Sequence, residues 1–158
     1  MMPFSFRFMP AVYAAAVALL VSSARVHAQS SSPMSIQLSG AGLVISGGLV
    51  PGAEAQVRYT AGRASLGGGY QFFTQNSARS DIVFVEPRLR LANTSRAAIY
   101  GAARLGVVTA SSTAVFGGGG GVLFAAARGM SIDLGAQVYS ADAKSVITQL
   151  RAGLSIGF

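Results

Sequence analysis

The end of the chain has the most restrictive pattern in the sequence. From Ser145 to Phe158 it reads S-V-I-T-Q-L-R-A-G-L-S-I-G-F. Every second residue from Val146 onward is apolar, apart from one threonine, while the residues between them include Gln149 and Arg151. A period of two is the period of a β-strand, in which successive side chains point to opposite faces. The stretch therefore predicts a long strand with one apolar face and an aromatic last residue.

The beginning of the chain has the features of an export signal. A short start with one cation, Arg7, precedes the apolar run 11–21, and Val26-His27-Ala28 forms a cleavage site with small residues at its ends. This order is typical of a secretory signal peptide. We predict a signal peptide at residues 1–28 and one mature domain at 29–158, of which 29–33 form a flexible leader.

The composition favours lipid as the environment of this domain. Only 11% of the residues are charged and 51% are hydrophobic, whereas a soluble domain usually has about 25% charged residues. Residues 105–127 are uncharged for long enough to suggest a membrane helix. However, Gly117 to Gly121 would each cost a helix about 1 kcal/mol relative to alanine. We interpret this stretch as two strands.

The charge balance indicates no nucleic-acid partner. Without Arg7 and Arg25, ten basic and five acidic residues remain. These cations are spread along the chain, whereas nucleic-acid binding requires a clustered basic patch. Cysteine is absent, so neither a disulfide framework nor a thiolate metal site is available. The sequence predicts no cofactor and no metal.

Alternation of the same kind recurs throughout the mature chain. It is clearest at residues 82–91, where Val83 and Val85 oppose Glu86 and Arg88. Pro87 in this stretch has no N–H to donate to the ladder, so it predicts a bulge beside Glu86. The predicted strands cover 34–46, 53–60, 64–73, 82–91, 97–109, 113–126, 130–140 and 145–158, with longer loops at 47–52 and 75–81. Eight strands with short connections predict an all-β fold, an eight-stranded antiparallel up-and-down transmembrane β-barrel. Closure is required because lipid offers no partner for a free sheet edge.

The last strand resembles the closing strand of bacterial outer-membrane β-barrels. In those proteins the assembly machinery recognises a terminal polar, glycine, apolar, aromatic pattern, which falls here on Arg151, Gly153, Ile156 and Phe158. An aromatic residue is commoner at the position of Ile156. The export signal and the eight strands extend the resemblance to small barrels of the OmpA transmembrane domain and OmpX type. It implies a monomer in the bacterial outer membrane that contacts outer-membrane lipid and, during biogenesis, the barrel assembly machinery.

A secreted lipocalin-like barrel is the competing all-β interpretation. Its strands alternate similarly, but the charged face points outward into water. Such a surface would need many more Lys, Glu and Thr residues than this chain has. The uncharged face of the clearest strands therefore favours the membrane barrel.

The polar face of the strands contains the candidate functional residues. The predicted lumen charges are Glu54, Arg58, Glu86, Arg88, Arg90, Arg104, Asp133 and Arg151. An eight-stranded barrel is only wide enough for its side chains to fill, so these groups must meet. Two interpretations follow: a structural network that plugs the lumen, which we favour, and a narrow channel for small polar or anionic solutes, suggested by five arginines against three acids.

Enzymatic activity has little support in the sequence. The only histidine, His27, precedes the predicted cleavage site, and histidine is the commonest general base and the usual partner of a serine nucleophile. An enzyme would depend on Glu54, Glu86 or Asp133 alone. We therefore predict a protein with a structural or interaction role that is not an enzyme.

Overall fold

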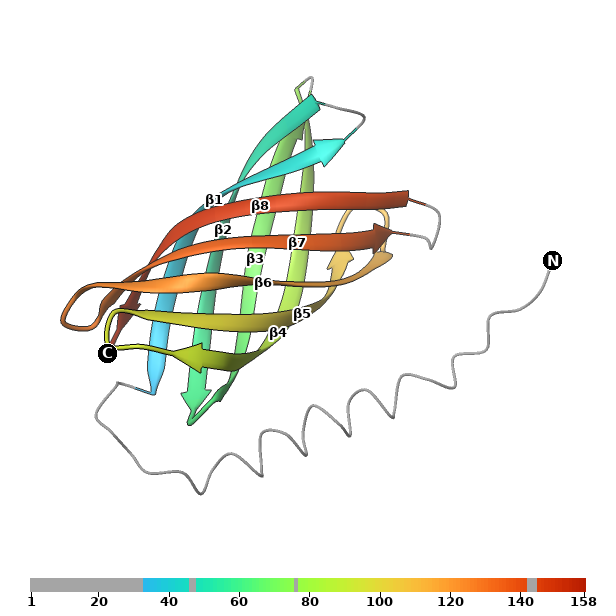
Figure 1. Cartoon of the computed structure of the whole chain (residues 1–158). Coiled ribbons are helices and arrows are strands. Elements are labelled where there is room, and N and C mark those ends of the chain that lie inside the picture. The colour runs from blue at the N-terminus through green and yellow to red at the C-terminus, as the bar shows by residue number, and fades with distance from the viewer. Residues whose placement is uncertain (1–32, 46–47, 76, 142–144) are drawn as a thin grey trace, which may run out of the picture.

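The computed structural model describes residues 33–45, 48–75, 77–141 and 145–158, and these form a closed barrel of eight strands (Figure 1). The strands are β1 (Met34–Ile45), β2 (Gly48–Ala61), β3 (Ala64–Gln75), β4 (Ala78–Asn93), β5 (Ala97–Val108), β6 (Thr113–Ala127), β7 (Met130–Ala141) and β8 (Ser145–Gly157). Each strand pairs antiparallel with the next, and β8 pairs with β1. The predicted eight-stranded antiparallel barrel is confirmed. The signal peptide predicted at 1–28 lies outside the described residues.

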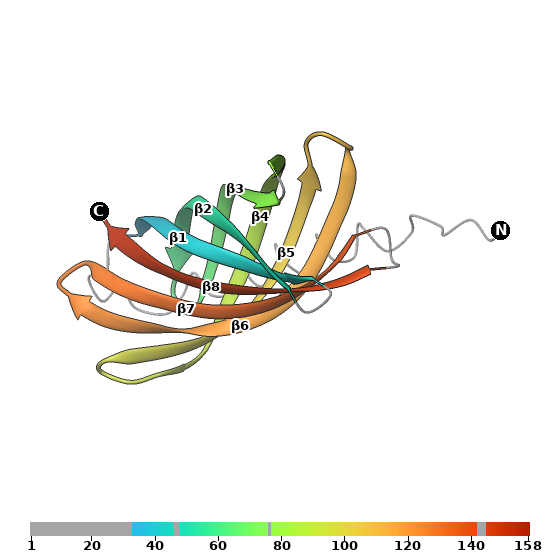
Figure 2. The same cartoon turned by 90° about the horizontal axis from the view of Figure 1, so that it is seen from above.

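The barrel has two distinct ends. At one, which we call the terminal end, the Phe158 N–H donates to the Met34 carbonyl at 3.0 Å, and the tight turns after β2, β4 and β6 lie there too. The opposite end, the loop end, carries the connections after β1, β3, β5 and β7. Figure 2 shows how the strands wrap around the interior between these ends.

Two predicted loops at the loop end are largely strand. β2 begins at Gly48 rather than at residue 53, and Val50 pairs with Leu43. β4 begins at Ala78 rather than at residue 82, and Arg79 pairs with Thr74. Clean alternation is missing in both stretches, but pairing with the neighbouring strand satisfies their backbone groups and continues the ladders.

The bulge predicted at Pro87 was wrong. Val85 pairs with Leu105 and Arg88 with Ala102, so the register between β4 and β5 is the same before and after the proline. The register shifts later in β4, between Arg90 and Ala92. The ladder therefore tolerates the missing donor in place, and the extra residue lies close to the terminal end, where the chain turns.

The outer face of the barrel is a continuous apolar surface. Every strand contributes exposed large hydrophobic side chains, such as Leu38, Val83 and Leu134, which are 60%, 54% and 46% exposed. A contiguous apolar surface of this extent on a monomer marks contact with something other than water. Among the described residues, none lies in a helix long and apolar enough to cross a membrane.

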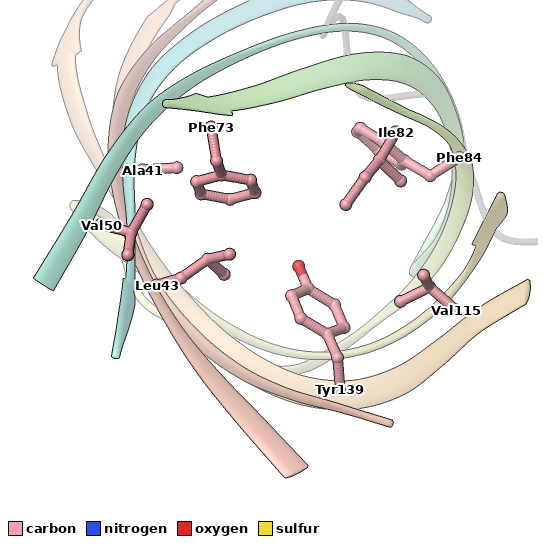
Figure 3. Packing of buried hydrophobic residues seen from close by; sticks show 8 residues of the cluster. All are labelled: Ala41, Leu43, Val50, Phe73, Ile82, Phe84, Val115 and Tyr139. Carbon is pink, nitrogen blue, oxygen red and sulfur yellow. The ribbon is translucent and has the colours of Figure 1, made fainter. Parts of the chain in front are cut away.

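The interior has three layers along the barrel axis. Towards the loop end lies an apolar cluster, shown in Figure 3, formed by Ala41, Leu43, Val50, Phe73, Ile82, Phe84, Val115 and Tyr139. The middle layer contains the buried charged residues. The third layer, at the terminal end, is a cavity of about 590 Å³. The interior is therefore polar only in part, because its loop-end third is hydrophobic.

We expect Leu134→Arg to lower the free energy of unfolding by about 2 to 4 kcal/mol in lipid vesicles, the cost of a cation on a lipid-facing position near the midplane. Leu134→Met, which keeps the position apolar, should cost little. Denaturant titration measures both. A change within about 0.5 kcal/mol for Leu134→Arg, as expected of an exposed site in water, would contradict contact with lipid.

Candidate functional site

Seven of the eight predicted lumen charges meet in the middle layer. They are Glu54 and Arg58 from β2, Glu86 and Arg88 from β4, Arg104 from β5, Asp133 from β7 and Arg151 from β8. Each occupies an inward position of the two-residue period, and each is at most 6% exposed. Strand alternation alone therefore places these charges in one buried volume.

Glu86 is the centre of this network and is completely buried. Its Oε1 lies 2.9 Å from Arg58 Nη2 and 2.6 Å from Arg88 Nε. Its Oε2 accepts a hydrogen bond from Arg104 Nε at 2.8 Å and lies 3.2 Å from Arg151 Nη1. One carboxylate thus pairs with four guanidinium groups from four different strands.

Glu54 and Asp133 connect the same arginines on either side. Glu54 lies 2.7 Å from Arg104 Nη1 and 3.0 Å from Arg151 Nη1. Asp133 Oδ2 lies 2.9 Å from Arg88 Nη1. Four arginines and three acids therefore form one network, and each buried charge has the partner that burial requires. One positive charge remains in excess.

Neutral polar groups complete the coordination. Gln137 Nε2 donates to Glu86 Oε2 at 2.8 Å, and Gln37 Nε2 donates to Asp133 Oδ2 at 2.7 Å. The Tyr100 hydroxyl donates to Asp133 Oδ1 at 2.6 Å. Glutamine amide groups and a tyrosine hydroxyl group thus donate hydrogen bonds to carboxylate oxygens that the arginines do not fully saturate.

Arg90 is the predicted lumen charge that the network does not include. It is half-buried, and its side chain makes no ion pair or hydrogen bond with the described residues. It lines the cavity at the terminal end instead. The alternation of the strand predicted that Arg90 faces the lumen, as it does, but its position along the barrel axis places it outside the charged layer.

Tyr100 and the apolar cluster, which includes Tyr139, were not predicted as part of the site. A Cβ built on Gly121 would lie 2.5 Å from the Tyr100 hydroxyl oxygen, and one on Gly135 would lie 2.9 Å from it. The glycines of β6 and β7 therefore make the room in which Tyr100 crosses the lumen. On the other side, the Arg104 guanidinium stacks 3.7 Å from the centroid of the Phe84 ring. The signal that could have revealed the apolar cluster is a run in which both the odd- and the even-numbered residues are apolar, such as residues 82–85.

The residues of the predicted assembly signal occupy both faces of β8. Arg151 points inward into the network, and Ile156 and Phe158 are exposed on the outer face. A Cβ on Gly153 would lie 2.1 Å from Ser39 Oγ, so the strand needs glycine there. Polar, small and apolar positions of this motif thus each have a packing role in the folded barrel.

The arrangement offers no metal centre within the part of the chain that the structure describes. No group of three His, Cys, Asp or Glu side chains there could hold an ion. The three acids of the network are each paired with arginine. Chemically, the site can hold its own charges in place and close the lumen.

The fold is that of small outer-membrane β-barrels. Neisserial surface protein A is 17% identical with a TM-score of 0.61, covering 82% of this chain and 100% of that one. The N-terminal barrel domain of OprF from Pseudomonas aeruginosa is 9% identical, with a TM-score of 0.59 and coverage of 82% and 100%. A de novo designed transmembrane β-barrel is 12% identical with a TM-score of 0.65, covering 82% and 98%.

No protein-family model and no curated protein matches the sequence. The likeness to the solved barrels is therefore one of fold. A designed barrel shares this fold as well as natural surface proteins do, so the fold does not specify a role.

We predict that Glu86→Gln lowers the free energy of unfolding by about 3 to 5 kcal/mol, because it leaves buried guanidinium groups without a counter-charge. Asp81→Asn is the matched control. Asp81 pairs with Arg79 at 2.7 Å near the loop end, where the arginine side chain is 55% exposed, so the same chemical change should cost far less there because water screens the pair.

Chemical denaturation of both variants in the same detergent measures the difference. Equal effects of the two substitutions would contradict a network that depends on buried Glu86.

Proposed function

We propose that the protein is a monomeric barrel of the bacterial outer membrane with a structural or interaction role and a sealed lumen, and that it is not an enzyme. The predicted signal peptide at 1–28 provides export. The apolar outer face provides the surface for outer-membrane lipid, and the C-terminal residues Arg151, Gly153, Ile156 and Phe158 provide recognition by the barrel assembly machinery.

The observation that carries this proposal is the direct contact between the charged layer and the apolar layer of the interior. Arg104 belongs to the charged layer, where it pairs with Glu54 and Glu86, and it also stacks on Phe84 of the apolar cluster. The two layers are therefore in direct contact, and a solute would have to cross both. An ion crossing the apolar layer would lose its water, and the Tyr139 hydroxyl is the one polar side-chain group of the cluster that could replace it.

The buried network also supports the absence of catalysis. A catalytic carboxylate needs access to substrate and a shifted proton affinity suited to its task. Glu86 and Asp133 are 0% exposed, and Glu54 is 3% exposed. Each is engaged by arginine, which favours a permanent structural charge.

A narrow anion channel is the second candidate. The excess of arginine over acid in the network and the wide cavity at the terminal end favour anions over cations. In this alternative the apolar cluster would have to open, because Phe73, Phe84 and Tyr139 are each at most 3% exposed and face the lumen.

Single-channel recording in planar bilayers separates the two candidates. We expect no steady conductance from the refolded wild type. Phe84→Ala, which opens only the apolar layer, should also remain closed because the charged layer persists. Insertion is verified independently by the gel shift between boiled and unboiled samples. A steady, anion-selective conductance of the wild type would reject the sealed lumen and favour the channel.

A further inference from the structure

The cavity at the terminal end is lined by positive charge. It has a volume of about 590 Å³ and opens towards the turns at that end. Its charged lining residues are Arg58, Arg63, Arg88, Arg90, Arg96 and Arg128. No aspartate or glutamate lines it. We call this cavity the basic vestibule.

Four of these arginines have no counter-charge among the residues that the structure describes. Arg58 and Arg88 form the floor and pair with Glu86. The side chains of Arg63, Arg90, Arg96 and Arg128 make no ion pair with any residue that the structure describes. Within the described part of the chain, the vestibule therefore has four arginines without an acidic partner above a floor of paired ones.

The tight turns of the terminal end hold three of these cations at the rim. Gly62 and Gly129 have positive φ angles of 62° and 74°, which allow the close turns beside Arg63 and Arg128. In the third turn, the Thr94 hydroxyl accepts a hydrogen bond from the Ala97 N–H at 3.0 Å. Each of the three turns thus presents one arginine.

The strand pairing is irregular at the same rim. Both register shifts of the barrel occur at this end, between Arg90 and Ala92 and between Ala125 and Ala127. Bulges at the rim of a barrel redirect side chains and are typically specific features of a fold. The positions of the arginines at this rim therefore depend on the three turns and on the two register shifts.

The charge distribution along the barrel is uneven. Three of the five acidic residues of the sequence are in the central network, and Asp81 lies near the loop end in β4. At the loop end, exposed Arg79 is paired with Asp81. Arg63, Arg90, Arg96 and Arg128 carry like charges at one rim and therefore repel one another. Among the described residues, no ion pair offsets this repulsion. A bound anion would remove the repulsion.

We infer that the basic vestibule binds a small anion carrying several phosphate groups. Arginine presents a planar fork of donors that matches the oxygens of a phosphate group, and several arginines around one cavity suit several such groups. The volume lies within the range of about 300 to 1,000 Å³ that is typical of small-molecule sites. This inference rests on the lining of the cavity and not on whether the lumen conducts.

Two sources can supply this chemistry: a soluble compound with several phosphate groups, or the headgroup of a phospholipid with two phosphate groups that folds into the rim. The strand residues that line the vestibule, such as Ser35, Gln37 and Ser131, occupy inward positions, while Arg63, Arg96 and Arg128 are exposed in the turns at its mouth. A soluble anion reaches them directly, whereas a headgroup must bend over the turns. The two sources can be told apart by competition.

Isothermal titration of the protein with tripolyphosphate, in an uncharged detergent at low salt, tests the inference. We expect saturable binding of one anion per barrel. The variant with Arg90→Gln and Arg96→Gln should bind at least about tenfold more weakly, because it removes two guanidinium groups that would donate charge-assisted hydrogen bonds to phosphate oxygens. Both residues lack an acidic partner, so their replacement leaves no orphaned carboxylate. The variant should unfold at the same denaturant concentration or a higher one.

Arg79→Gln is the matched control, because it removes an arginine at the opposite end of the barrel. It should leave tripolyphosphate affinity unchanged. Absence of binding to the wild type, or equal loss of affinity in the control and in the vestibule variant, would overturn the inference.

A second arm repeats the titration in bicelles with and without cardiolipin, whose headgroup carries two phosphate groups. Unchanged affinity assigns the site to a soluble anion. Weakening of tripolyphosphate binding by the lipid, in the wild type but not in the vestibule variant, assigns the same phosphate site to a headgroup.

Discussion

The burial of Glu86 among four arginines is the interaction on which the rest of this barrel depends. Burying a charge without a partner costs more free energy than a small domain can supply. The lumen of an eight-stranded barrel leaves no room for water to solvate several such groups separately. The strand register must therefore bring Arg58, Arg88, Arg104 and Arg151 to one height. A slip of one residue would turn each of them towards the apolar outer surface.

The three interior layers give the two ends of the barrel different properties. The apolar cluster, with Phe73 and Phe84 nearly fully buried, fills the interior towards the loop end. The basic vestibule leaves the terminal end open and positively charged. The network between them joins both layers, because Arg104 contacts the aromatic side and Arg88 lines the cavity.

Strand alternation made most of the fold predictable from the sequence. The period-two pattern identified eight strands, and parity assigned Glu54, Arg58 and Asp133 to the inside, where they are buried. Parity does not report height along the axis. For that reason Arg90 was grouped with the network although it lies in the vestibule. Sequence also did not reveal the apolar cluster, because residues such as Leu43 and Val50 lie in runs that are apolar on both faces.

The most direct test of a mutually paired network is a double-mutant cycle between Glu86→Gln and Arg104→Gln, with the free energy of unfolding measured in one detergent. Residues that share a buried network typically show coupling of about 0.5 to 3 kcal/mol. The structure predicts a coupling of at least about 1.5 kcal/mol, because removing either partner already loses the pair. Effects of the two substitutions that add within about 0.5 kcal/mol would contradict the pairing on which the account depends.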